Sequence, residues 1–225
     1  MKRIALALGA TLFFVSACNN GAETKTESAT TSGDSAKMTD KKDEKMSSGD
    51  AKPITVDSAT MMQKMMDYGK VGPVHEMIAK SNGTWTGEVT MWMDPKAPPQ
   101  KSTATVVNKM IMGGRYQVSN ASGNMMGMPF EGQGTLAYDN MKKLLISTWI
   151  DNMGTGIMKL EGPWDEATKT ATLSGRCSEP VRGEDVTIRE TFKMIDDNNQ
   201  MMEMYGPGPD GKEMKMMEIK YTRKK

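Results

Sequence analysis

The sequence predicts an all-β domain of about ten short antiparallel strands, arranged as a sandwich or a barrel. Many short segments after residue 83 alternate between apolar and polar residues, as half-buried strands do. Clusters of Gly, Pro, Asn and Asp separate these segments at intervals of roughly 8–12 residues. No helical pattern interrupts them, and about 140 residues are enough to enclose one hydrophobic core.

The clearest strand is the segment TWTGEVTMWM, which begins at Thr84. Its alternation places Trp85, Val89 and Met91 on one face of the strand and Trp92 on the other. The turn-forming segment DPKAPPQ follows it. Further strands are predicted at residues 102–112, 115–121, 128–138, 143–151, 155–162, 170–177, 185–195, 200–206 and 213–222.

Residues 59–82 are predicted to form short helices, which we expect to close one end of the β domain. Asp57 or Ser58 can cap the first helix by accepting hydrogen bonds from its free N–H groups. Gly72-Pro73 ends this helix, and a second short helix follows at residues 74–80. An apolar stripe on the first helix is formed, at spacings of three and four, by Met61, Met62, Met65 and Met66.

Residues 1–17 have the organisation of a bacterial signal peptide. Lys2 and Arg3 precede a mostly apolar run over residues 4–15, which suits a signal-peptide core and is too short to span a bilayer. Small residues then lead to Cys18. This arrangement resembles a bacterial lipobox, and the resemblance implies cleavage before Cys18 and lipid attached to that residue. Because Asn19 rather than Asp follows, we expect an outer-membrane lipoprotein whose domain lies in the periplasm.

Residues 18–58 are predicted to be the lipidated cysteine and a disordered tether. The segment consists mainly of Ser, Thr, Gly, Ala, Lys, Asp and Glu and has no aromatic residue, so it cannot bury enough surface to fold alone. A coil of about 40 residues reaches roughly 35 Å. The remaining residues 59–225 carry a net charge of +1, and so nearly neutral a domain is not expected to bind nucleic acid.

Two resemblances refine the fold. The tripeptide Gly83-Thr84-Trp85, on the first strand after a short helix, resembles the Gly-x-Trp signature of lipocalins and related calycin barrels. It implies a single calycin-like barrel over residues 83–225. A wider resemblance covers residues 72–224, where segments such as NKMIMGGRY, GNMMGMPFEG and DEATKT are similar to a family of bacterial exported proteins, the domain of unknown function one-five-seven-nine. That family has no established reaction or site residues to carry over.

The sequence offers few of the positioned acids, bases and nucleophiles that catalysis requires. His75 is the only histidine and is interpreted as a residue that packs a helix. The thiol of Cys177 is interpreted as a small apolar side chain buried within a strand. There is no P-loop, dinucleotide-binding loop or nucleophile elbow. We therefore predict a protein that is not an enzyme and holds no cofactor.

The 25 methionines leave several functions open, because methionine fills apolar interiors and thioethers also bind Cu(I). The first hypothesis is a module that binds a small hydrophobic ligand, with cavity residues Trp85, Val89, Met91, Met128, Phe130 and Tyr138. The alternative is a Cu(I)-binding or oxidant-buffering envelope protein, with a metal site at Met125, Met126 and Met128. A third is a protein-interaction module that uses exterior methionines and Trp92.

Overall fold

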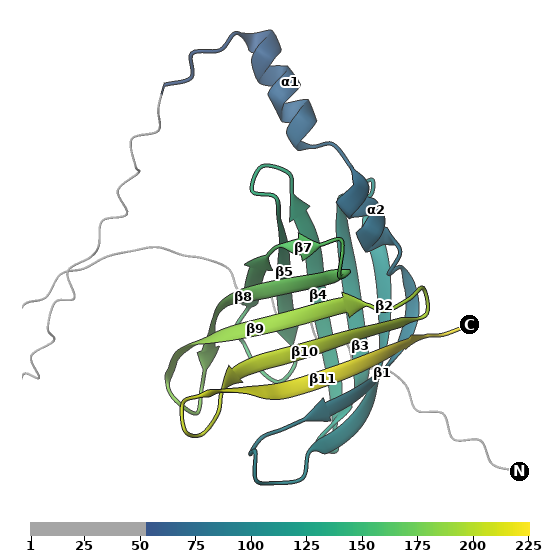
Figure 1. Ribbon diagram of the computed structural model, residues 1–225, viewed down its shortest axis with the longest axis vertical. Helices are drawn as coiled ribbons and strands as arrows, with labels where there is room; N and C mark the ends of the chain where they lie inside the picture. The colour runs from purple at the N-terminus through teal and green to yellow at the C-terminus, as the bar shows by residue number, and fades with distance from the viewer. Residues whose placement is uncertain (1–52) are drawn as a thin grey trace, which may run out of the picture. The chain divides into compact units, whose positions relative to one another are not determined.

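The computed structural model describes residues 53–225 and shows an antiparallel β-barrel preceded by two short helices (Figure 1). The helices are α1 (Ser58–Tyr68) and α2 (Pro73–Ala79). The strands are β1 (Gly83–Met91), β2 (Gln100–Ile111), β3 (Tyr116–Met125), β4 (Met128–Asp139), β5 (Leu144–Asp151), β6 (Met158–Gly162), β7 (Trp164–Asp165), β8 (Thr170–Glu179), β9 (Glu184–Met194), β10 (Asn199–Pro207) and β11 (Glu213–Arg223).

The strands follow one another around the barrel in chain order, with antiparallel pairing throughout. β1 pairs with β2 on one side and with β11 on the other, which joins the first strand to the last. The sheet closes where β6 pairs with β8 through Glu161 and Ser174. The predicted all-β class is confirmed, and the closed sheet decides between sandwich and barrel.

β6 and β7 are two parts of one bent strand. Pro163 lies between them and has no N–H to donate to the ladder. Its carbonyl accepts a hydrogen bond from the Thr172 backbone N–H at 3.2 Å, so the chain stays beside β8 through the bend. Counted as one strand, β6 and β7 complete the ten predicted strands. The sequence interpretation ended this strand at residue 162 and therefore missed β7.

The hairpin between β3 and β4 is tighter than the sequence suggested. The strands predicted at residues 115–121 and 128–138 leave six residues between them, whereas β3 runs on to Met125 and β4 begins at Met128. The two residues between them both have positive φ, 52° at Met126 and 80° at Gly127. Two such residues make the turn whose twist matches antiparallel strands, so the hairpin needs no longer loop.

Helix α2 covers one end of the barrel, as expected. Its Ile78 is only 1% exposed and belongs to the same buried cluster as Leu145, Leu160 and Leu173 from three strands. Gln117 at the start of β3 donates to the Ile78 carbonyl at 3.0 Å, which satisfies a carbonyl that the short helix leaves free. We refer to this end as the closed end of the barrel.

Helix α1 begins with the predicted cap, since the Asp57 carboxylate accepts from the Thr60 N–H at 2.9 Å. Hydrogen bonds from the side chain of Asn140 to the carbonyls of Tyr68 and Lys70 fasten the end of this helix to the turn after β4. None of its residues is buried, and its stripe is exposed at Met61, Met62, Met65 and Met66.

No helix within residues 53–225 is long and apolar enough to cross a membrane. The predicted signal peptide, Cys18 and the tether up to residue 52 lie outside the described residues.

Candidate functional site on the inner face of the barrel

The inner face is identified by the alternation of buried and exposed residues along each strand. On β9, Val186, Ile188 and Met194 are all less than 10% exposed, and the same face carries Glu190 and Phe192. Strand register extends this face to the neighbouring strands, because residues paired directly across an antiparallel ladder point the same way. Glu190 thus lies between apolar residues on the inner face of β9, whereas Glu184 has the same parity but is exposed at the end of the strand.

A set of polar contacts seals the closed end. The Trp85 indole is 1% exposed and donates to the Ser81 carbonyl at 2.8 Å. The Arg223 guanidinium lies 4.1 Å from the centre of the Trp85 ring and donates to the carbonyls of Lys80 and Asn82. Gln200 donates to the Ser81 hydroxyl at 3.1 Å. These contacts hold the C-terminal end of α2 against β1 and β11, so a ligand is not expected to enter here.

His75 belongs to this closed end. It is 4% exposed, its Nδ1 accepts from the Gly72 N–H at 3.2 Å, and its ring meets the Tyr138 ring edge-to-face at 5.7 Å. Burial, together with the charge of Arg115, lowers the pKa of His75, which keeps the imidazole neutral. Its contacts are those of a packing residue. No group of three or more His, Cys, Asp or Glu side chains within residues 53–225 is placed to hold a metal ion.

Glu190 and Tyr221 are enclosed titratable side chains that belong to no polar network. Burial raises the pKa of the Glu190 carboxyl from 4.5 to about 7. Burial, and then the charge of Glu190, raise the pKa of the Tyr221 phenol, which places the two groups within electrostatic reach. Neither the carboxyl nor the phenol hydroxyl makes a hydrogen bond to another group in the described part of the chain. Such groups normally have a partner when they are buried.

Both side chains nonetheless keep some solvent-accessible surface, and so do the methionines around them. The register places Glu190 beside Met204, Met204 beside Met217, and Met217 beside Met91, and all of these are only half-buried. A group surrounded by protein that still keeps accessible surface lines an interior space. The accessible surface of these inner-facing side chains favours an interior that they do not fill completely.

Gly87 makes room for Tyr221 in this space. Tyr221 pairs with Gly87 across the β1–β11 ladder, and a Cβ on Gly87 would lie 3.2 Å from Cε1 of the Tyr221 ring. With no side chain at this position, the ring can lie against the wall of the barrel. Its hydroxyl then lies within the interior that Glu190 shares.

The predicted cavity residues all lie at strand positions that face the interior of the barrel, but they differ in how exposed they are. Trp85, Val89 and Phe130 are at most 9% exposed, while Met91 and Tyr138 are half-buried. The sixth, Met128, is 47% exposed at the β3–β4 hairpin. The predicted metal ligands are at this hairpin, on the end of the barrel opposite α2. There Met125 pairs with Met128 and Met126 occupies the turn.

Sequence interpretation missed Glu190 and Tyr221, although the signal was present. In the segment VTIRETF, strict alternation places Glu190 on the face shared by Val186, Ile188 and Phe192. A carboxylate at an apolar-face position is unusual unless it is paired or functional. Tyr221 shares a face with Ile219 in the last strand by the same reasoning.

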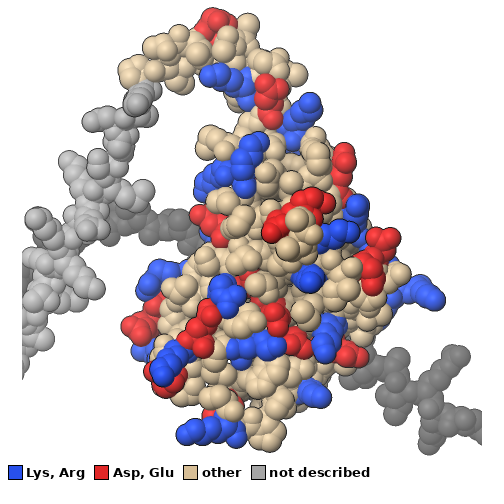
Figure 2. Space-filling model, viewed as in Figure 1, with Lys and Arg blue, Asp and Glu red and all other residues tan. Residues whose placement is uncertain are grey.

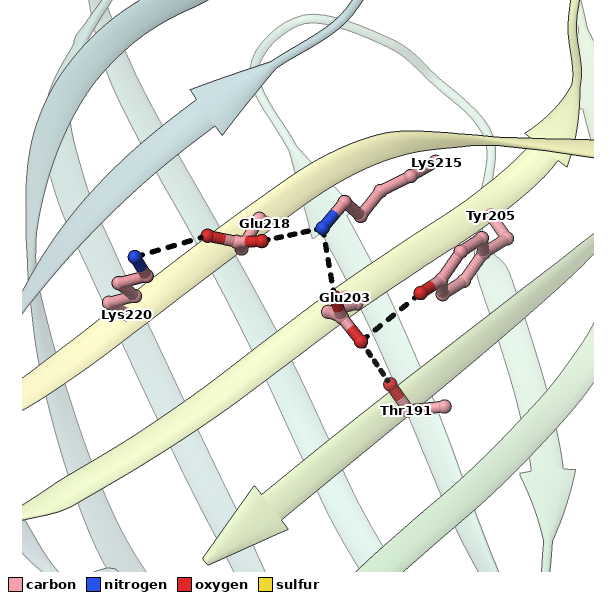
Figure 3. Close-up of polar contacts among 6 residues, drawn as sticks. All are labelled: Thr191, Glu203, Tyr205, Lys215, Glu218 and Lys220. Carbon is pink, nitrogen blue, oxygen red and sulfur yellow. Dashed lines mark hydrogen bonds and ion pairs between the residues drawn. The ribbon is translucent and has the colours of Figure 1, made fainter. Parts of the chain in front are cut away.

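The outer face carries mixed charges and a connected polar network. Lys, Arg, Asp and Glu intermingle on the face shown in Figure 2. In Figure 3 the Lys215 ammonium bridges Glu203 at 3.0 Å and Glu218 at 2.6 Å. This network spans β10 and β11 beside their bulge at Met204 and Tyr205. Its members are partly exposed, so each pair contributes at most about 1 kcal/mol. The network stabilises the pairing of these strands, and the enclosed carboxyl of Glu190 is not part of it.

A separate hollow lies outside β1, β2 and β3, with a volume of about 600 Å³. Hydroxyl side chains and the amines of Lys101 and Lys224 line it. One of these amines, Lys224 Nζ, already donates to the Thr105 hydroxyl at 3.0 Å. The hollow is open and contains no enclosed group without a partner, so the inner face remains the stronger candidate site.

Comparison with known proteins places the chain in a family. The model of the protein family of unknown function DUF1579 matches residues 70–223. The chain belongs to this family. The resemblance expected from the sequence is thereby confirmed, and as a DUF1579 protein the chain inherits no described reaction. No curated protein sequence matches it.

Solved structures support the barrel fold of this DUF1579 protein. Rv2717c from M. tuberculosis is similar with a TM-score of 0.54 and 11% identity, over 69% of this chain and 100% of that one. The S-type phycobiliprotein lyase CPES from Guillardia theta is similar with a TM-score of 0.50 and 12% identity, over 70% of this chain and 96% of that one. At these identities the likeness concerns the fold alone.

Proposed function

We propose that this protein binds a small, mainly hydrophobic molecule inside the barrel. The observation that carries the proposal concerns Glu190 and Tyr221, which point into the barrel among half-buried methionines. Both side chains keep some accessible surface and neither has a hydrogen-bond partner in the described part of the chain. In a barrel filled by its own side chains, such polar groups would cost free energy with no compensating contact. In a binding site they supply the few polar contacts that orient an otherwise apolar ligand.

The sequence also favours a cellular location for this ligand binding. The signal peptide and Cys18 favour a lipoprotein that is anchored in the outer membrane and reaches its ligand in the periplasm. A protein so placed can carry apolar molecules between membranes or remove them from the periplasm. The absence of a plausible catalytic constellation in the sequence favours binding over catalysis.

The test is a comparison of ligand binding between two matched phenylalanine variants. Ala104 lies on the inner face, since it pairs with Gly87, and its neighbour Thr105 points outward. Native mass spectrometry and the fluorescence of a neutral, environment-sensitive dye report binding. We expect Ala104→Phe to reduce binding strongly and Thr105→Phe to leave it unchanged. Equal binding by the unaltered protein and Ala104→Phe would show that the ligand does not occupy the interior.

The strand register favours a second candidate, a Cu(I) site. Met91, Met217 and Met204 occupy directly paired positions on three adjacent strands, so their thioethers share one part of the inner face. Three thioethers suit Cu(I). The site predicted from the sequence, Met125, Met126 and Met128 on the β3–β4 hairpin, is the other position at which Cu(I) binding is tested.

An anaerobic Cu(I) competition titration distinguishes the two methionine groups. Triple replacement by Leu at either group should preserve the fold, because each Met-to-Leu change usually costs less than about 1.5 kcal/mol. Loss of tight Cu(I) binding only in the Met91, Met204, Met217 variant would support the inner site. No binding by the unaltered protein, with its methionines verified as reduced, would exclude both.

A further inference from the structure

The inner face has an unbalanced charge. Its one basic residue is Arg223, whose guanidinium is held at the closed end by the Trp85 ring and by backbone carbonyls. In the described strands, the other titratable side chains with inner-face parity are Tyr138, Asp151, Cys177, Glu179, Glu184, Glu190 and Tyr221. All of these are acids. At the pH where Glu190 ionises, its carboxylate has no counter-charge in the barrel.

We infer that the molecule bound in the barrel is a hydrophobic amine, whose protonated nitrogen binds the Glu190 carboxylate. This inference rests on the proposed function and names the class of its ligand. An ammonium group supplies both the missing charge and the missing hydrogen-bond donors. A carboxylate ligand would be repelled, and a neutral alcohol would leave the charge of Glu190 uncompensated.

The wall around Glu190 suits a cation with an apolar body. Leu173 and Met204 lie at its paired positions on β8 and β10, and Phe192 follows it on the same face of β9. Thioethers are polarisable, and an aromatic face attracts cations. Arg189 is next to Glu190 in the sequence, and Glu203 lies on the neighbouring strand β10. Both side chains point outward, where Arg189 pairs with Glu213 and Glu203 pairs with Lys215.

Binding of this kind depends on pH in a defined way. Because burial raises the pKa of Glu190 to about 7, the carboxyl of the free protein is protonated at about pH 5 and ionised at about pH 8. An alkylammonium group, like that of lysine, keeps its proton up to about pH 10. The amine should therefore bind tightly between about pH 7 and 10 and lose affinity below pH 7. His75 is held neutral at the closed end and does not give this dependence.

The experiment compares three eight-carbon ligands that differ only in their head groups. Octylamine, octanol and octanoate each compete with a neutral, environment-sensitive dye for the full-length protein at about pH 8. We expect octylamine to bind at least about tenfold more tightly than octanol, as a hydrogen bond between two charged groups provides. Octanoate should bind more weakly than octanol. At about pH 5 the advantage of the amine should fall by at least about tenfold.

Two variants test whether Glu190 is the source of the preference for octylamine. Glu190→Gln should lose the preference for octylamine over octanol, whereas Glu131→Gln, an exposed position on β4, should keep both this preference and dye binding. If the dye binds but octylamine and octanol compete equally at pH 8, the amine inference is overturned while the proposed function stands. If the preference persists in Glu190→Gln or is the same at pH 5, Glu190 is not its source. If neither the dye nor any octyl ligand binds, both proposals are overturned.

Discussion

Replacing Glu190 with Gln should stabilise the ligand-free protein strongly at pH 8 and much less at pH 5. In the folded protein the pKa of this carboxyl is about 7, against an ordinary 4.5. One pKa unit corresponds to about 1.4 kcal/mol. Holding the ionised carboxylate inside the barrel therefore costs about 3 kcal/mol once the pH exceeds both pKa values. Gln has the same shape and no charge, so it removes this cost.

The sign follows from the number of protons bound in each state. Between about pH 4.5 and 7, the folded protein holds the Glu190 proton more tightly than the unfolded chain does. Stability is therefore lost as the pH rises through this window and is constant with respect to this group above it. Below it, the carboxyl is protonated in both states and the Glu and Gln side chains are nearly equivalent.

Urea unfolding at the two pH values measures this effect. We expect Glu190→Gln to raise the free energy of unfolding by about 3 kcal/mol at pH 8 and by about 1 kcal/mol or less at pH 5. Glu131→Gln serves as the exposed control and should change stability by less than about 0.5 kcal/mol at both. Destabilisation by Glu190→Gln at pH 8 would show that a group of the protein already compensates the carboxylate and would refute the reasoning.

Three further predictions test the fold and the anchor. Trp85→Ala should cost about 3–5 kcal/mol, because it removes a large buried aromatic, while Trp92→Ala on the outer side should cost about 1 kcal/mol or less; denaturant unfolding compares them. Gly132→Ala should cost about 1–3 kcal/mol, because its Cβ would lie 2.3 Å from the Trp149 ring, and the tryptophan fluorescence should change as that ring is displaced. Cys18→Ser should move the protein out of the membrane fraction and abolish its labelling with palmitate; a variant that stays in the membrane would disprove the predicted anchor.

The features that the sequence predicted are those set by local patterns. Alternation places Trp85 and Val89 on one face of β1 without reference to the rest of the chain. The cap at Asp57 and the break at Gly72-Pro73 are equally local. Closure of the barrel depends on the contact between Glu161 and Ser174. No pattern within either strand encodes that contact, so the choice of a barrel came from a resemblance.

The candidate site was missed for a related reason. A face was recognised by its apolar residues, so a single acid at an inner position counted as an exception to the pattern. Glu190 is informative because it is this exception: its neighbours Ile188 and Phe192 fix its direction. Its charge acts on Tyr221 although the register places the two residues four positions apart, so no strand pattern could have shown this. The short hairpin at Met126 was missed because so tight a turn requires a positive φ at this residue. Methionine seldom adopts a positive φ, so its presence in the sequence does not indicate such a turn.

The composition of the interior bears on how selective the site can be. The inner positions near Glu190 on β10, β11 and β1 are taken by Met204, Met217 and Met91, which are flexible and can adapt to ligands of different shape. Such a wall discriminates poorly between apolar bodies, because one methylene group more or less changes the free energy of binding by only about 1 kcal/mol. A buried carboxylate discriminates strongly by charge, since a wrong head group leaves it unpaired. The proposed amine site should therefore accept ligands of varied length and branching while rejecting the neutral and anionic analogues of each.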